Sequence, residues 1–187
     1  DAQDDFVLAV AESGAIQARV SLWENNLGTI TPRGSVDVGT GVNSPTSVAI
    51  GDLDGAGLRD ITVGSNEQQG DMQTGDEPAV ALINDGGGSF TVSQIDIVRP
   101  VDTLIADVDN DGVGEAIYTF DNQTIPFDGS EVYDVGPGAN RIRQWGEGLG
   151  ARAIAAGDLV ADGNGFIDYV VANGTSNDIT VSLWNGA

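Results

Sequence analysis

Residues 47–60 read SVAIGDLDGAGLRD, and residues 103–115 read TLIADVDNDGVGE. Each stretch is a short apolar run followed by alternating Asp residues and glycines, and it ends on an acidic residue at position 60 or 115. Residues 153–168, AIAAGDLVADGNGFID, repeat the pattern with two extra residues inside the loop. Apolar and β-branched runs bounded by Gly, Asp and Asn are typical of β-strands. The recurrence indicates that one structural unit is used several times in this chain.

The acidic residue that closes each loop gives the period of the repeat. It recurs as Asp5, Asp60, Glu115 and Asp168, at intervals of 55, 55 and 53 residues. The two ends of the chain share the unit, because DFVLAV and VSLWENN near the start parallel DYVVAN and VSLWNGA at the end. We therefore predict a single domain over residues 1–187. Its repeat units are expected at about residues 1–44, 45–100, 101–149 and 150–187.

The units predict an all-β fold. A strand precedes each loop, a second follows it, and a third and a fourth are separated by Gly/Asn turns, while no sustained helical period is present. Repeated units of four short antiparallel strands are typical of a β-propeller, here of about four blades. The first blade lacks its first strand and the last blade its fourth, so both are incomplete. Residues 66–78 are expected to form a surface loop.

The loop DVDNDGVGE places acidic side chains at its positions 1, 3, 5 and 9. Alternate residues of a tight loop turn their oxygens inward, a glycine allows the chain to reverse, and a backbone carbonyl adds one more ligand, as in other calcium loops. A solvated turn in which Asp side chains cap their own backbone is the alternative. The predicted calcium ligands here are Asp107, Asp109, Asp111, Val113 and Glu115.

The other loops are less regular. Ala56 replaces one carboxylate in the loop of the second unit, so we expect that loop to bind calcium more weakly, or not at all. The fourth unit resumes the spacing after two extra residues. A further loop is represented only by Asp1 and Asp5. The predicted ligands are Asp52, Asp54 and Asp60 in the second unit and Asp158, Asp162, Asn164 and Asp168 in the fourth.

Composition excludes several functions. The 187 residues include 29 Asp and Glu against seven Arg, for a net charge of −22, and a chain without a basic surface is a poor partner for nucleic acid or an anionic membrane. Cys, His and Lys are absent. That removes disulfides, thiolate and Ser-His-Asp catalysis and ordinary zinc sites. No apolar run is long enough for membrane insertion. The acidity indicates cation binding, solubility in high salt, or both.

The loops and their flanks resemble the FG-GAP/VCBS repeat family, which includes the propeller of integrin α subunits and many bacterial and archaeal surface proteins. The pattern VAIGDLDGAGLRDITVGSN…VALINDGGGSF, residues 48–90, is the most specific part of the resemblance. It implies four-stranded blades, calcium in the loop between the first and second strands, extracellular adhesion or ligand binding, and usually no catalysis. Ala56, the insertion at Val160 and Ala161, and the absence of literal Phe-Gly and Gly-Ala-Pro sequences depart from the family pattern.

These observations favour a secreted or cell-surface, calcium-binding structural or adhesion module over an enzyme. We expect it to form a homo-oligomer, filament or other polymer through the incomplete terminal blades, or to bind a glycan or a surface protein. A glycan-binding lectin is the alternative, and a glycoside hydrolase using two carboxylates is less favoured. Asn122 and Asn173 lie in glycosylation sequons, which matter only if the protein is exported by a cell that glycosylates.

Overall fold

The computed structural model describes residues 6–11, 18–38, 44–65, 79–95, 97, 100–120, 129–135, 140–146, 150–160 and 165–184. For residues 6–11, 129–134 and 140–146 the backbone alone is described. This part of the chain forms strands and turns without helices, which confirms the all-β class. Some predicted features lie outside the described residues. They are the loop 66–78 and residues Asp1, Asp5, Asn122, Asp162 and Asn164.

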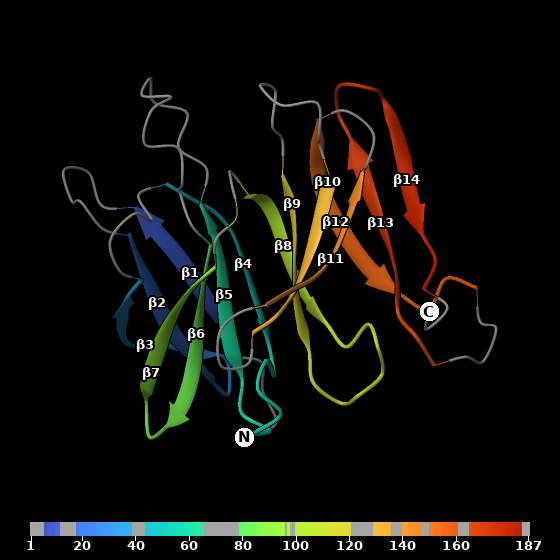
Figure 1. Ribbon diagram of the computed structural model, residues 1–187. Helices are drawn as coiled ribbons and strands as arrows, with labels where there is room; N and C mark the ends of the chain where they lie inside the picture. Colours follow the sequence, from blue (N-terminus) through green and yellow to red (C-terminus); the bar gives the residue numbers. More distant parts are fainter. Residues whose placement is uncertain are drawn as a thin grey trace.

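Fourteen strands of the described part form four antiparallel sheets (Figure 1). The first sheet contains β1 (Phe6–Ala11), β2 (Ala18–Asn26) and β3 (Thr29–Asp37). The second contains β4 (Pro45–Gly51), β5 (Asp60–Ser65), β6 (Ala79–Gly86) and β7 (Ser89–Ile95). The third contains β8 (Pro100–Ala106), β9 (Glu115–Phe120), β10 (Gly129–Asp134) and β11 (Asn140–Gly146). The fourth contains β12 (Ala151–Gly157), β13 (Asp168–Asn173) and β14 (Asp178–Ser182).

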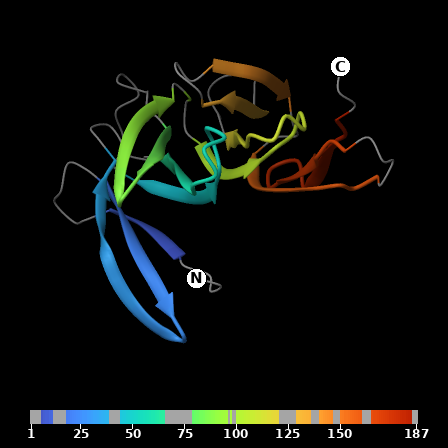
Figure 2. The same cartoon turned by 90° about the horizontal axis from the view of Figure 1, so that it is seen from below.

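Within each sheet the strands pair in the order of the chain, each with the next. The strands of one sheet come from one repeat unit, except that β8 begins one residue earlier, at Pro100. The sheets follow one another around an open arc, in which β1 packs on β4, β4 on β8 and β8 on β12 (Figure 2). None of the sheets closes on itself, so the propeller of four blades stays a prediction.

The apolar core lies between neighbouring sheets. Every residue of β5 and of β9 is buried, because these second strands have a strand on each side and a packed sheet on both faces. Val20 packs with Val63 between the first two sheets, whereas Ala81 packs with Tyr118 between the second and the third. The Tyr118 hydroxyl also hydrogen-bonds that of Thr62 across this second interface. The sheets are thus held together by their middle strands.

This arrangement places three equivalent connections at one end of the sheets. Since each connection joins the first and second strands of an antiparallel pair, it must lie where β4, β8 and β12 end. That end is the lower edge of the molecule in Figure 1. The acidic loops singled out in the sequence are these connections.

Candidate metal centres

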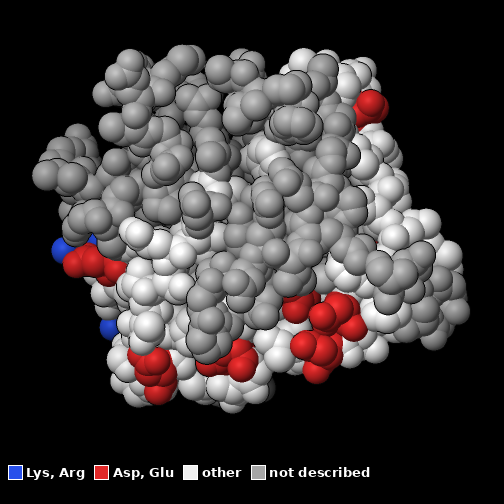
Figure 3. Space-filling model, in the orientation of Figure 1, with Lys and Arg blue, Asp and Glu red and all other residues white. Residues whose placement is uncertain are grey.

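Three Asp loops lie side by side at this end of the molecule. We call residues 52–60 the first Asp loop, residues 107–115 the second Asp loop and residues 158–168 the third Asp loop. Figure 3 shows acidic side chains gathered along the same lower edge. In two of the loops carboxylates converge closely enough to hold a metal ion.

The first Asp loop brings three carboxylates together. Oxygens of Asp52, Asp54 and Asp60 all lie within 4.8 Å of one another. Asp52 also shapes the loop, because its carboxylate accepts the backbone N–H groups of Gly55 and Gly57, each at 2.8 Å. The repulsion among three like charges at this spacing is relieved when they bind a cation.

The second Asp loop has the same construction. Oxygens of Asp107, Asp109 and Glu115 lie within 4.8 Å of one another. Asp107 accepts the backbone N–H of Gly112 at 2.9 Å and that of Asp111 at 3.1 Å. The two loops therefore present equivalent groups of carboxylates, although their sequences differ at five of the eight positions before the closing acid.

Asp111, a predicted ligand, is not a member of that group of three. Its side chain is exposed, and one of its oxygens accepts the backbone N–H of Val113 at 2.8 Å. Ala56 occupies the equivalent position of the first Asp loop, which explains why the missing carboxylate leaves the first group intact. Asp111 and the Val113 carbonyl as ligands stay predictions.

The backbone conformation of the loops explains their glycines. At the fourth position Gly55 has a φ of +73° and Asn110 a φ of +61°, and Asn is one of the few other residues that adopts this left-handed conformation readily. At the sixth position Gly57 and Gly112 have φ values of +78° and +93°, and Gly165, which matches them after the two extra residues of the third loop, has a φ of +80°. The third Asp loop thus returns to the register of the other two at Gly165, as the sequence predicts.

Asp60, the closing acid of the first loop, is fully buried at the start of β5. One of its oxygens accepts the N–H of Leu53 at 2.6 Å, and the other accepts the N–H of Asn84 in β6 at 2.8 Å. The carboxylate therefore ties its loop to the third strand of the sheet. Burial raises the pKa of Asp60, as do the charges of Asp54 and Asp52, while the two N–H donors oppose the shift.

The closing acids of the other two loops are 4% exposed, and each accepts an N–H from its own loop. Glu115 accepts the N–H of Val108 at 2.8 Å. Asp168 accepts the N–H of Leu159 at 3.0 Å and that of Trp184, just beyond β14, at 2.9 Å. In each loop the N–H donor is the residue that follows the first Asp. The repeated contact explains why an acidic residue recurs at these positions whether or not a metal is bound.

The pKa of Glu115 is strongly raised. Burial raises its pKa from the ordinary 4.5 to about 7, and the charges of Asp109, Asp111 and Asp107 push it in the same direction. The N–H of Val108 lowers the pKa but does not cancel these effects. Such a carboxyl group gains the most from a cation, since the cation favours its ionised form.

The first and second Asp loops touch each other. The N–H of Gly114 donates to the carbonyl oxygen of Asp52 at 2.8 Å. A Cβ at Gly114 would lie 2.7 Å from that oxygen and 2.7 Å from Cγ2 of Ile105, so only glycine fits without movement. A Cβ at Gly55 would likewise lie 3.0 Å from Cγ2 of Val113. The two groups of carboxylates are therefore neighbours on one packed surface.

The third Asp loop continues this row. Asp158 is exposed at its start, whereas Asp162 and Asn164 lie outside the described residues, so their convergence with Asp158 stays a prediction. A Cβ at Gly165 would approach Nδ2 of Asn110 to 2.9 Å. The third loop thus contacts the second, much as the second contacts the first.

Sequence reasoning missed the partners that hold the site in place. Asn84 in β6 and Trp184 just beyond β14 donate their N–H groups to acids that lie more than 15 residues away along the chain. The repeat could have indicated these donors, because Asn84 and Trp184 occupy equivalent positions near the ends of β6 and β14. Gly114 was also missed, although an extra glycine next to a closing acid suggests a close backbone approach.

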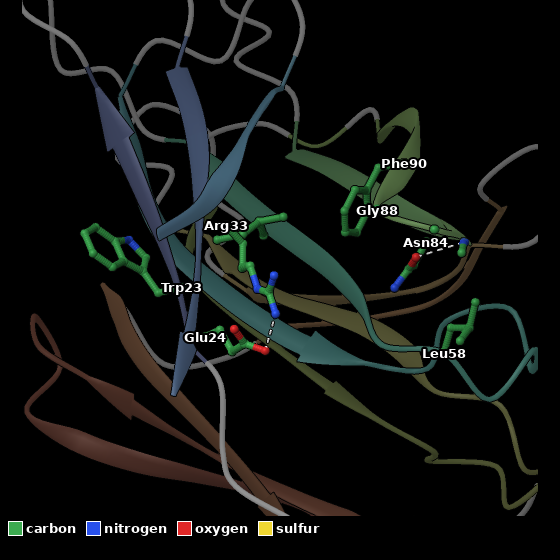
Figure 4. Close-up of a pocket in the computed structure, with 10 residues that line it drawn as sticks. Trp23, Glu24, Arg33, Leu58, Asn84, Gly88 and Phe90 are labelled. Atoms are coloured by element: carbon green, nitrogen blue, oxygen red, sulfur yellow. Dashed lines mark hydrogen bonds and ion pairs between the residues drawn. The ribbon is translucent and has the colours of Figure 1, made fainter. Parts of the chain in front are cut away.

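A cavity of about 350 Å³ lies between the first and second sheets, beside the first Asp loop (Figure 4). Phe90 and Leu58 contribute apolar walls, and Arg33 forms an ion pair with Glu24. The Asn84 amide donates to a backbone carbonyl at 3.2 Å and accepts a backbone N–H at 3.0 Å. These polar groups bind one another or the backbone, which favours a packing defect over a ligand site.

Comparison with known proteins gives no family assignment. A scan against protein-family models and a search of the curated proteins found no match to this chain. Within the residues that the structure describes, no helix is both long enough and apolar enough to cross a membrane.

Proposed function

We propose that this protein is a calcium-binding structural module that works outside the cell, as a member of the FG-GAP/VCBS class of repeat proteins or a close analogue. The observation that supports calcium most strongly is the pair of equivalent, touching Asp loops, each with three carboxylates whose oxygens lie within 4.8 Å of one another. Self-assembly into an oligomer or filament, or binding of a glycan or surface protein, belongs to the same proposal.

The chemistry of the donors supports calcium among the biological cations. The groups offer only carboxylate oxygens, and the chain has neither His nor Cys, so soft metals and zinc lack their usual ligands. Calcium accepts six to eight oxygen ligands in flexible loops, whereas magnesium demands a tighter octahedron. Sites of extracellular modules typically have dissociation constants of ~10⁻⁴–10⁻³ M, which fill outside the cell and stay empty in the cytosol. Sites with such constants would be filled at the extracellular location that we propose for this protein.

The closing acids support a structural role for the ion. Each of them already links its loop to a strand, so an ion bound to Asp60 or Glu115 would add to contacts that stabilise the fold. For these reasons we favour a structural module over an enzyme.

Isothermal titration calorimetry tests the proposal. We expect calcium to bind with at least two sites per chain, magnesium to bind more weakly, and the double variant Asp52→Asn/Asp107→Asn to lose most of the heat. Asp85→Asn is the matched control, because Asp85 is an exposed acid that bonds Thr91 outside both groups. A wild-type protein that gives no heat at millimolar calcium would refute the proposal.

A further inference from the structure

The fourth sheet presents an uncovered apolar face. Ile179 and Val181 of β14 are 67% and 50% exposed, and Leu183 just beyond the strand is 58% exposed. Alternate residues of a strand point to the same side, so all three belong to one face. We call this surface the open face. It comprises Ala155, Val170, Ala172, Ile179, Val181 and Leu183.

Strand register confirms that these residues share one side of the sheet. Val170 pairs with both Val181 and Ala155, and Ala172 pairs with Ile179. Directly opposite residues in antiparallel strands lie on the same face. The open face is therefore apolar from Ala172 to Leu183, and Asp168, the next residue on this side of β13, is only 4% exposed. Contiguous exposed apolar surfaces of this kind mark interaction sites in soluble proteins.

The equivalent face of the other sheets is buried, and always by the same kind of neighbour. In the first sheet Ala18 and Val20 pack on Ile61 and Val63 of the second sheet. In the second sheet Ala79 and Ala81 pack on Ala116 and Tyr118 of the third. The third sheet uses Ile117 in the same way against the fourth. We call the face of a sheet that packs on the next sheet its front, and the opposite face its back. In all three interfaces the front of one sheet packs on the back of the sheet that follows it in the chain.

This repeated packing identifies the kind of partner that the open face fits. By analogy with the other interfaces, the open face should pack on the back of another sheet of the same type. Among the described sheets, the first sheet stands at the end of the arc, with no preceding sheet against its back (Figure 2). On β2 that back surface includes Arg19, Ser21 and Trp23, which alternate with the buried Ala18 and Val20. The open face and this back surface lie at opposite ends of the arc.

We propose that the open face docks onto the back of the first sheet in a second copy of this chain. The contact is head-to-tail, so it generates a ring if the rotation closes and a filament if it does not. It specifies face-to-face packing, in place of the pairing of strand edges expected from the incomplete blades. This inference rests on the self-assembly part of the proposed function and not on calcium.

Charge shapes the conditions for this assembly. Each copy has a net charge of −22, so copies repel one another, whereas the open face itself is uncharged. Salt screens the repulsion between copies and leaves the burial of apolar surface in place. Assembly should therefore strengthen as the salt concentration rises.

Sedimentation velocity over a range of protein concentrations at high salt tests whether the open face mediates association. We expect the wild type to associate and the double variant Ile179→Asp/Val181→Asp to need at least about tenfold higher concentration, since association would bury two new charges. Both positions are exposed, so the fold should tolerate the change. Val92→Asp on β7, 40% exposed, is the matched control and should associate normally. If the wild type stays monomeric, the proposal of self-assembly is wrong. If the double variant associates as the wild type does, self-assembly stands but the open face is not the contact surface.

Cross-linking tests the head-to-tail geometry. The chain has no cysteine, so single-cysteine variants give a clean background. A mixture of Val181→Cys and Ser21→Cys should form mixed dimers under a short thiol cross-linker, faster than a mixture of Val181→Cys and Val92→Cys. If Val181→Cys cross-links with itself as fast as with Ser21→Cys, the face docks on its own copy and the head-to-tail proposal is wrong.

Discussion

The first and second Asp loops have the same structure and different sequences. Both gather three carboxylates within 4.8 Å, both use positive φ at the fourth and sixth positions, and both bond a closing acid to the residue after the first Asp. Yet only the second loop has a fourth carboxylate, at Asp111, and only the second closes on Glu in place of Asp. The comparison teaches that loop shape is set by backbone contacts, so the differences should affect ion affinity and not the fold.

We expect the largest effect on stability and calcium binding from a variant that forces the two loops apart. In Gly114→Ala the new Cβ would clash with the Asp52 carbonyl oxygen, 2.7 Å away, so the shared contact must open. We expect a loss of about 1–3 kcal/mol in the free energy of unfolding, as for other overpacked positions, and weaker calcium binding at both loops. Urea unfolding measures the first effect. Gly157→Ala, with nothing within 4 Å of the new Cβ, is the control, and equal losses in both variants would contradict the coupling.

Removing one member of each group compares the loops directly. Asp109→Ala should lower calcium affinity by about tenfold or more, and Asp54→Ala should cost less, because only Asp109→Ala disrupts a loop with four carboxylates. The acidic residues of the two loops differ at position five, Ala56 against Asp111, and at the closing position, Asp60 against Glu115. Titration calorimetry of both variants decides the matter. Equal losses would show that the carboxylate missing at Ala56 has no effect on binding.

Exchanging the residues at the fifth position of the two loops tests whether the carboxylate there affects calcium affinity. Ala56→Asp should raise the affinity of the first loop toward that of the second, and Asp111→Ala should lower the second toward the first. Both side chains are exposed, so we expect little change in stability without calcium. If neither exchange alters the calcium titration, Asp111 is not a ligand and the group of three carboxylates is the complete site.

The pH provides a smaller effect, to which the second loop contributes through Glu115. Because the pKa of Glu115 is raised from 4.5 to about 7, the cation-free folded protein binds more protons than the unfolded chain between these values. Its free energy of unfolding should therefore fall as the pH rises through this window. Calcium should remove the fall, since it favours the ionised group. Glu115→Gln should reduce the fall, and a variant with the wild-type pH profile would contradict the assignment.

The smallest effect concerns the fourth position. Asn110→Ala places a residue with a Cβ and no side-chain amide at a φ of +61°, which should cost about 1 kcal/mol, whereas Asn110→Gly should be nearly neutral. Gly55→Ala should cost more than Asn110→Ala, because its Cβ also meets Val113. Thermal unfolding without calcium ranks the three variants, and the opposite order would show that loop shape is not set by the backbone.

The loops and the order of the strands were predictable because short local sequence patterns specify them. The alternating Asp and Gly residues specify each loop, and the closing acids at the starts of β5, β9 and β13 give the strand order. The contacts that join repeats were not predictable, since Gly114 with Asp52 or Thr62 with Tyr118 are pairs more than 50 residues apart. No local rule specifies such pairs. The uncovered face of the fourth sheet is likewise a property of how sheets pack.

Thermal unfolding with calcium and with chelator tests the central claim most directly. An ion that binds only the native loops stabilises the fold by ~2.7 kcal/mol per site at a hundredfold excess over its dissociation constant. We predict that calcium raises the melting temperature of the wild type, and that the increase largely disappears in Asp52→Asn/Asp107→Asn while Asp85→Asn retains it. A wild-type melting temperature that is the same in calcium and in chelator would contradict the account.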